Sequence, residues 1–224
     1  IMVAGLQRKE EYNKYGEILI MARYNGPRAR VVRRLEYPVF ESSKFSAIRK
    51  SYPPGQHGPT KRRSKMSNYG IQLREKQRIK YLYGVLEKQF RNYFKKAASK
   101  KGATGHNLLI MLESRLDNTV YRLGLAPTRR ASRQLINHKH FLVNNKVVNI
   151  PSYLLSDGDV IQVRDKSKRF AIFQDSMRRI QGDNPVPWLT IDKSKLNGVF
   201  NNIPGREEIP ETVNEQLVVE LYSK

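Results

Sequence analysis

Three arginines stand close together in the stretch APTRRASRQLINHKHFLVNNKVVN, which covers residues 126–149. Thr128 is a plausible N-cap, so Arg129, Arg130 and Arg133 would lie in the opening turns of a short helix. Arginines in this position could belong to a catalytic pocket, a solvated surface or a phosphate-binding face. Because the apolar residues of the helix fall on another side, the pattern predicts an arginine face that is open to a ligand.

The overall charge favours an anionic ligand. The chain of 224 residues holds 42 Lys and Arg against 20 Asp and Glu, a net charge of +22 with a pI near 10.3. Such an excess opposes compaction unless a polyanion neutralises it, so nucleic acid is the first partner to consider, ahead of a merely soluble basic surface. Hydrophobic residues make up 39% of the chain, which argues against a wholly disordered protein.

Other side chains that could do chemistry are few. Cysteine is absent, and four scattered histidines do not form the cluster with carboxylates that a metal-dependent nuclease needs. His57 lies in the loop SYPPGQHGP, where a hydrogen-bonding or RNA-stacking histidine is favoured over a general base. Asp117 is interpreted as the structural partner of a nearby arginine. The sequence therefore predicts no catalytic residue, no metal and no cofactor.

Neither a membrane span nor a targeting peptide is indicated. No apolar run approaches the roughly 18 residues of a membrane helix. The first twenty residues mix acidic and basic side chains and hold no serine, which argues against a signal or transit peptide.

The elements that would position the arginines begin with a basic arm. Between Ala22 and Met66 twelve basic residues stand against two acidic ones, and glycines and prolines interrupt the stretch. Its apolar periodicity is poor. We therefore predict an arm with little core of its own, ordered by its partner.

Helices should follow the arm. Apolar residues recur every three or four positions from Ile71 to Lys101, with Gly84 dividing the stretch into two helices. Ten cations against two acids in this stretch favour a phosphate-facing surface over a merely solvated one. A further single helix is predicted in HNLLIMLESRLDNTVYRLGL, residues 106–125, ending near Gly124.

A small antiparallel ribbon should come next. FLV and KVV flank the turn Asn144-Asn145, and SDGD turns the chain into VIQV at residues 160–163. Another helix is expected from Ala171 to Ile180. The last twenty residues are acidic, which suits either a neighbouring protein or an internal patch against the basic helices.

Several long motifs resemble one protein family. MARYNGPRARVVRR, YPPGQHG, YGIQLREKQRIKYLYGVLEKQFRNYF, ESRLDNTVYRLGLAPTRRASRQLINH and NEQLVVELYSK closely resemble the S-four proteins of the small ribosomal subunit, of bacterial or organellar type. The resemblance covers residues 21–224, and residues 1–20 stand outside it as an extension. Some members bind zinc through cysteines in the arm, and this chain, which has none, is expected to be a zinc-free variant.

The resemblance implies an α+β fold, in which a mainly helical domain is interrupted by an inserted RNA-binding domain of two helices and a small antiparallel sheet. The expected boundaries are 21–66 for the extended basic arm, 67–106 plus 197–224 for the helical domain, and 107–196 for the inserted domain. Its two-helix motif would span 113–138.

The implied partners are ribosomal. Family members bind a multi-helix junction in the 5′ region of small-subunit rRNA early in assembly. They contact small-subunit protein five near the mRNA entrance, and they influence translational accuracy. Localisation would follow the ribosome, in the bacterial cytoplasm or in an organelle matrix or stroma.

The residues expected to bind RNA are the basic and polar side chains of the arm and the helices. They are Arg23, Arg28, Arg30, Arg33, Arg34, His57, Lys61, Arg62, Arg63, Lys65, Arg74, Lys76, Arg78, Lys80, Arg91, Arg115, Thr128, Arg129, Arg130, Ser132, Arg133, Gln134 and Lys139. A protein contact is expected at Asn214, Glu215 and Glu220.

Two rival functions remain at this stage. Pseudouridine synthases often carry the same two-helix module and place their catalytic aspartate in an RLD context, which recurs here as Arg115-Leu116-Asp117. Three residues are a weak signal, and no separate catalytic domain accompanies them. A stand-alone RNA chaperone would lack the long arm and the LVVELYSK end.

Overall fold

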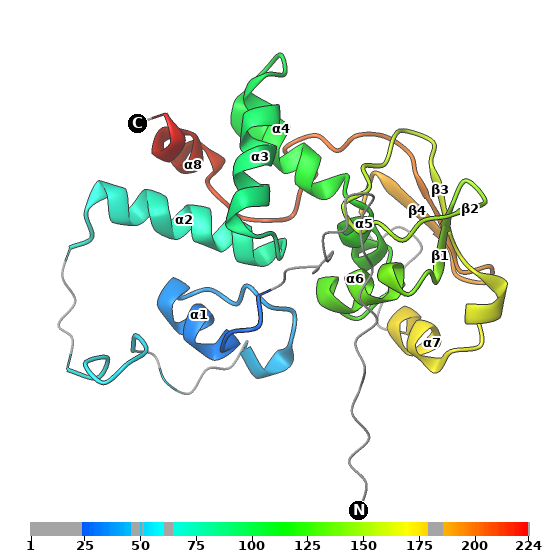
Figure 1. The fold of residues 1–224 in the computed structure, drawn as a ribbon, viewed down its shortest axis with the longest axis horizontal. Coiled ribbons are helices and arrows are strands. Elements are labelled where there is room, and N and C mark those ends of the chain that lie inside the picture. Colours follow the sequence, from blue (N-terminus) through cyan, green and yellow to red (C-terminus); the bar gives the residue numbers. More distant parts are fainter. Residues whose placement is uncertain (1–23, 46–49, 51, 61–64, 179–185, 224) are drawn as a thin grey trace, which may run out of the picture.

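The computed structural model describes residues 24–45, 50, 52–60, 65–178 and 186–223. Within them, helices gather at one end and an antiparallel sheet at the other (Figure 1). The helical end is built from α1 (Arg28–Leu35), α2 (Asn68–Leu82), α3 (Glu87–Ala98), α4 (Thr104–Glu113) and the C-terminal α8 (Glu215–Tyr222). None of the described helices is long and apolar enough to cross a membrane.

Between α4 and α8 the chain forms the other end. The remaining elements are α5 (Leu116–Arg122), α6 (Arg129–Asn137), β1 (Phe141–Val143), β2 (Lys146–Val147), β3 (Val160–Val163), α7 (Ala171–Met177), β4 (Leu189–Asp192) and β5 (Asn197–Phe200), with short 3₁₀ turns at Ser43–Phe45 and Asp165–Ser167. Since α8 packs on α2 and α4, the helical domain is interrupted by an α+β insertion, as predicted.

The sheet has the strand order β2-β1-β3-β5-β4, antiparallel throughout. Asn144 and Asn145 both adopt left-handed backbone conformations, with φ of 49° and 63°, as a two-residue hairpin turn requires, so the predicted ribbon is confirmed. Strand β5, however, lies between β3 and β4. The sheet therefore continues to Phe200, beyond the boundary at residue 196 that the sequence suggested.

One hydrophobic core joins the two ends. Ile79 and Phe90 of the helical end, Leu116 of α5, and Phe141 and Trp188 of the sheet end all belong to it and are nearly or fully buried. Because the same core runs through both ends, the sheet is held in a fixed place relative to α2 and α3.

The predicted division of residues 71–101 is confirmed. Helix α2 ends at Leu82, Gly84 follows with φ +62°, and α3 begins at Glu87. By contrast, the single helix predicted for residues 106–125 is wrong. The backbone of Arg115 is extended and forms a β-bridge with Leu154, so α4 and α5 are separate helices.

The arm departs from its prediction. Helix α1 buries Val31, Val32 and Leu35, and together with Val39 they form a second small core against which Tyr81 of α2 packs. Apolar residues at positions 31, 32 and 35 form one face of this helix. This face was not predicted from the sequence because arginines surround it. The described part of the arm therefore has a core of its own, and α1 is held against α2.

Candidate nucleic-acid interface

The arginines of α6 are oriented by the cap of their helix. The side chain of Thr128 accepts a hydrogen bond from the backbone N–H of Ala131 at 3.1 Å, which confirms it as the N-cap. This start directs Arg129 and Ser132 toward α5, so that both are buried, with exposed fractions of 5% and 0%. The helix thus begins where it was predicted, but two of its polar side chains point inward.

Arg129 is the centre of a buried ion-pair network. Its guanidinium donates to Glu41 and Glu211 at 3.0 Å each and to the amide oxygen of Asn118 at 2.7 Å. Glu211 also pairs with Arg122, which in turn pairs with the fully buried Glu113. The network therefore joins the arm, α4, α5, α6 and the segment before α8.

A second cluster surrounds Asp117. Arg115 donates to both its carboxylate oxygens, at 3.0 and 2.7 Å, and Arg133 donates to one of them and to the carbonyl of Gly84. Ser132 donates to the carbonyl of Asp117. Burial alone would raise the pKa of Asp117, but the two arginines hold it below its ordinary value. The interpretation of Asp117 as a structural partner of arginine is confirmed.

The prediction of an open arginine face on α6 is therefore wrong. Arg115, Arg129 and Ser132 are buried, and Arg133 is turned to the protein. The reason is that Asp117 of α5 pairs with Arg115 and Arg133, and two acids distant in sequence, Glu41 and Glu211, pair with Arg129. A buried guanidinium stays where carboxylates satisfy its donors. These four residues hold the fold together and do not offer a phosphate-binding surface.

The other residues of α6 that the sequence pointed to lie further out. Arg130 is half-buried and lines a small hollow together with Tyr24 and Lys80, while Gln134 and Lys139 are exposed. This side of α6 adjoins a larger groove, because Tyr24, Lys80 and Tyr81 line both hollows.

That groove lies between α1 and α2 and has a volume of about 620 Å³. Arg30, Arg34, Arg74 and Lys80 line it, and no acidic side chain is among the described residues that do so. Arg30 and Arg34 are exposed, and no ion pair joins either of them to a carboxylate of the described chain. A groove with cations and no acids is suited to phosphate.

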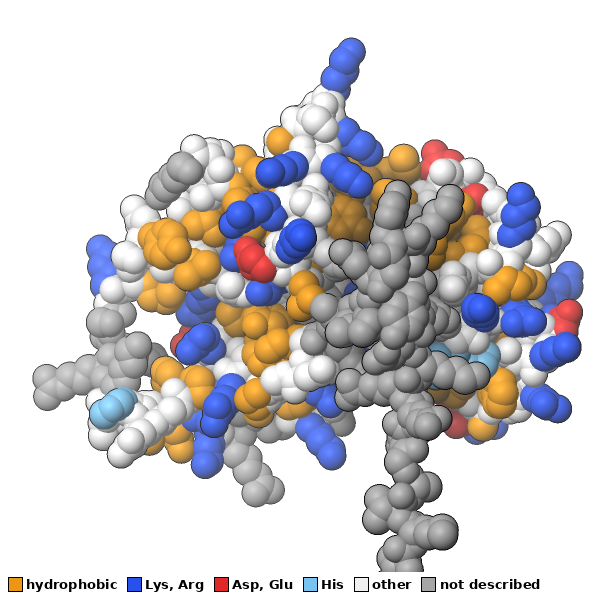
Figure 2. All heavy atoms as spheres, viewed as in Figure 1, with side chains coloured by type: hydrophobic (Ala, Val, Ile, Leu, Met, Phe, Trp, Pro, Cys, Tyr) orange, Lys and Arg blue, Asp and Glu red, His pale blue; other side chains and the backbone are white. Residues whose placement is uncertain are grey.

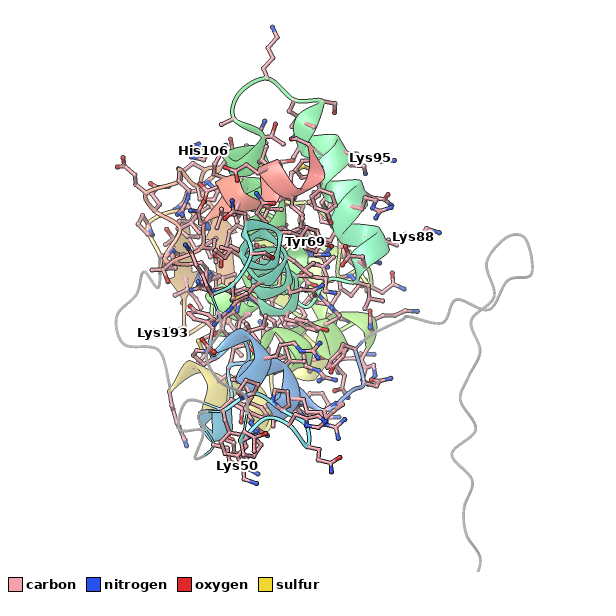
Figure 3. All side chains as sticks on the ribbon, turned by 90° about the vertical axis from the view of Figure 1, so that its left-hand side faces the viewer. Lys50, Tyr69, Lys88, Lys95, His106 and Lys193 are labelled. Carbon is pink, nitrogen blue, oxygen red and sulfur yellow. The ribbon has the colours of Figure 1, made fainter. Side chains whose placement is uncertain are left out.

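A further set of cations lies on α3. Lys88, Arg91 and Lys95 are exposed and follow one another at three- and four-residue steps, so they share one side of the helix, the α3 face. Figure 3 shows Lys88 and Lys95 pointing outward in the same direction. In Figure 2 basic side chains gather along α3 and again over α1, on the same side of the molecule. The α3 face and the groove thus form one candidate interface.

Several other residues predicted to bind RNA form ion pairs with acidic side chains or hydrogen bonds to backbone carbonyls of the chain. Lys76 and Lys80 pair with Glu87, Arg74 with Glu36 and the carbonyl of Leu35, Arg78 with Glu75, and Arg33 donates to the carbonyls of Tyr52 and Pro53. Arg28, His57 and Lys65 are exposed. Arg23, Lys61, Arg62 and Arg63 lie outside the described residues.

The set of predicted RNA-binding residues omitted part of this interface. Lys88, Lys95, Lys96, Lys100 and Lys101 are exposed at α3 and the turn after it, although only Arg91 of this helix had been included. They are among the ten cations of residues 71–101 for which the sequence favoured a phosphate-facing surface, and the three- and four-residue steps of Lys88, Arg91 and Lys95 place these three on one side of the helix. Tyr24 and Tyr81 could not have been found in this way, since only the packing of α1 on α2 brings them together.

The three C-terminal residues predicted to contact a protein make contacts within the chain. Asn214 caps α8 through its side-chain oxygen, Glu215 pairs with Arg206, and Glu220 accepts a hydrogen bond from Gln72. The sequence left two alternatives for this acidic end, a neighbouring protein or an internal patch against the basic helices. The contacts within the chain are those of an internal patch.

No group of three or more His, Asp or Glu side chains in the described part of the chain could hold a metal ion. The geometry is that of a polyanion-binding surface built on a core of ion pairs.

Comparison with known proteins agrees with this description. The family profile "Ribosomal protein S4/S9 N-terminal domain" matches residues 23–113, and the profile "S4 domain" matches residues 114–161. The chain is 56% identical to the small ribosomal subunit protein uS4 of Cytophaga hutchinsonii, 53% to that of Parabacteroides distasonis and 52% to that of Chlorobaculum tepidum. Each alignment covers 204 residues, 91% of this chain and 100% of the relative.

Proposed function

Since the chain belongs to the uS4 family of small ribosomal subunit proteins, we propose that it binds small-subunit rRNA through the groove between α1 and α2 and through the α3 face. In this family the protein is a structural constituent of the small subunit, and its place is the ribosome. One observation carries the assignment of the surface: basic side chains gather along α3 and over α1 on the face drawn in Figure 2. The exposed cations of these two helices include Arg30, Arg34, Lys88, Arg91 and Lys95.

The physical basis is the release of counterions. Phosphates of RNA hold condensed cations, and each lysine or arginine that replaces one of these counterions makes binding more favourable. The cations of the groove rim and the α3 face can do this without first breaking an ion pair to a carboxylate. The inward arginines of α6 cannot, because their donors already serve Asp117, Glu41 and Glu211.

We infer a more detailed role from the family resemblance. The protein would bind a multi-helix junction in the 5′ region of the rRNA, and it would do so early in subunit assembly. Contact with small-subunit protein five, and an influence on translational accuracy, would follow from its place in the subunit. Asn214, Glu215 and Glu220 would form part of that protein contact, for which the exposed side chains of Asn214 and Glu220 remain accessible.

An RNA-modifying enzyme is the weaker alternative. Its catalytic aspartate would be Asp117, whose side chain is 2% exposed and bound by two arginines. A carboxylate held in this way has no free approach to a uridine, so the structural role is preferred.

The proposal can be tested by sedimentation and by filter binding. The protein should sediment with small ribosomal subunits and stay bound through a wash with moderate salt. It should also bind a transcript of the 5′ region of small-subunit rRNA more tightly than an unrelated transcript of equal length. Sedimentation apart from the subunits, with equal affinity for both transcripts, would contradict the proposal.

A further inference from the structure

The lining of the groove between α1 and α2 includes a hydrogen-bond acceptor that has no donor among the described residues. Gln77 of α2 lines the groove, and its amide oxygen is buried with no hydrogen-bond partner among the described residues. Buried polar atoms in folded proteins nearly always have a partner, so such an exception points to a missing ligand or water. The last side-chain torsion of Gln77 has broad minima, so its amide can rotate to meet a donor that enters the groove.

A tyrosine ring lies at the wall of the same groove. A Cβ atom added at Gly26 would lie 2.6 Å from the hydroxyl of Tyr24, so only glycine lets the ring settle over the backbone there. The ring also meets Tyr81 edge to face, with 5.1 Å between centroids. Two aromatic side chains, one from the segment before α1 and one from α2, are thereby in contact at the groove.

The rim of the groove supplies positive charge. Arg30 and Arg34 are four residues apart on α1 and therefore lie on one side of it, beside Tyr24. Within hydrogen-bonding reach, a guanidinium presents several donors to a phosphate. The groove thus combines an aromatic surface, an unused acceptor and a cationic rim.

These three features match the three parts of a nucleotide. The base has flat faces that stack on aromatic rings and N–H groups that donate to an amide oxygen, and the phosphate pairs with arginine. Bases inside an RNA duplex cannot offer their faces or their pairing edges, whereas unpaired bases can. A volume of about 620 Å³ lies in the range of small-molecule sites and accommodates one nucleotide.

We propose that this groove binds an unpaired nucleotide of the RNA, with its base at Tyr24 and Gln77 and its phosphate at Arg30 and Arg34. The proposal rests on the rRNA-binding function and adds to it a site that distinguishes unpaired from paired RNA. On the α3 face no described buried side-chain atom is left without a hydrogen-bond partner, so this face would take the sugar–phosphate backbone only.

The test uses the full chain and two probes of equal charge. One probe is octauridylate, and the other is an octamer of the same sugar–phosphate backbone without bases. Because stacking contributes strongly per base, the wild-type protein should bind octauridylate at least about fivefold more tightly than the abasic octamer. Tyr24→Leu, which keeps apolar volume, and Gln77→Leu, which removes the acceptor, should each bring this ratio toward one. Neither change should alter the affinity for the abasic octamer by more than about twofold.

Tyr69→Leu is the matched control. Tyr69 is 57% exposed at the start of α2, faces the viewer in Figure 3 and does not line the groove, so its replacement should leave the ratio unchanged. Arg30→Gln should weaken the binding of both octamers equally, because it acts on phosphate.

Two outcomes would overturn the nucleotide site: a wild-type ratio of one, or an unchanged ratio in both groove variants. Binding of the 5′-region rRNA transcript separates this failure from that of the proposed function. If the wild-type protein binds the transcript specifically but does not distinguish the octamers, the site is wrong and the function stands. If specific transcript binding is also absent, the proposed function fails with it.

Discussion

Two arginine-rich helices of this protein use the same residue type in opposite ways. In α1, Arg30 and Arg34 are exposed at a groove whose described lining contains no acid. In α6, Arg129 is buried and Arg133 is turned inward, and both pair with carboxylates. The density of arginine is similar in the two helices. The difference lies in whether the fold brings acids to them.

The comparison explains how a chain with net charge +22 folds around ion pairs. Glu113 and Asp117 are fully buried, and each is bound by two or more hydrogen-bond donors. The chain has few acidic residues, and several of them form ion pairs with arginines where the arm, α5, α6 and the C-terminal segment meet. As a result the cations of α1 and α3 have no carboxylate partner among the described residues and can pair with an anionic ligand.

The largest expected effect concerns Arg129. Its replacement by alanine should lower the free energy of unfolding by about 3–5 kcal/mol, because Glu41 and Glu211 lose the buried cation that lies between them. Arg34→Ala on α1 is the matched variant and should change the free energy of unfolding by no more than about 0.5 kcal/mol. Urea unfolding followed by circular dichroism measures both. Equal losses in the two variants would show that the two helices do not differ as described.

The next effect depends on pH. Burial alone would raise the pKa of Glu113, but Arg122 and Arg129 outweigh it and hold the pKa below its ordinary value of 4.5. A depressed pKa stabilises the fold above about pH 4.5, and this stabilisation is lost as the pH falls through the lower pKa of the folded state. Glu113→Gln should therefore be less stable than the wild type by about 3 kcal/mol at pH 7, and the gap should narrow below pH 4.5.

Thermal unfolding between pH 7 and pH 3 checks this expectation. Glu36→Gln is the control from the region of α1, since Glu36 is exposed and its pair with Arg74 is a surface ion pair worth about 0–1 kcal/mol. A gap for Glu113→Gln that stays constant down to pH 3 would mean that Glu113 does not carry the pH dependence.

The sequence predicted the local elements well and the orientation of the charges poorly. Thr128 as N-cap, the break at Gly84 and the Asn144-Asn145 turn follow from backbone preferences of a few adjacent residues, and all are confirmed. The partners of Arg129 are 88 and 82 residues away in sequence, so no local pattern reveals them.

The same reason explains why the groove was not predicted. Lys88 and Lys95 are different, because they belong to a single helix and were already among the cations expected on a phosphate-facing surface. The groove forms only when α1 packs on α2. This packing places Tyr81 of α2 against Val31, Val32 and Leu35 of α1, and no local sequence pattern predicts it. The break between α4 and α5 likewise depends on a bridge from Arg115 to the distant Leu154.

A smaller effect is expected in RNA binding. Changing Arg30, Arg34 and Lys95 together to alanine should flatten the slope of log affinity against log salt by roughly two to three units, since each cation accounts for about 0.7–0.9. Lys76→Met is the control from the inward set, because Lys76 is buried against Glu87, and it should leave the slope unchanged. Filter binding to the 5′-region transcript across a salt series measures both. A slope that responds to Lys76 and not to the triple variant would reverse the assignment of the interface.

The smallest effect tests whether the two regions differ in anything besides the direction of their charges. Ser67 caps α2, beside the groove, and Thr128 caps α6, each by accepting one backbone hydrogen bond, at 3.2 and 3.1 Å. An N-cap contributes about 1 kcal/mol whether the helix faces RNA or the protein core, so Ser67→Ala and Thr128→Ala should lower the free energy of unfolding by similar amounts. The two sites share no hydrogen-bond partner, so the double variant should lose about the sum. Neither change removes a charge, and the salt slope of RNA binding should stay that of the wild type. If Thr128→Ala alone flattened the slope, the outer side of α6, with Arg130 and Gln134, would belong to the RNA interface after all, and the boundary between the outward and inward arginines would move into that helix.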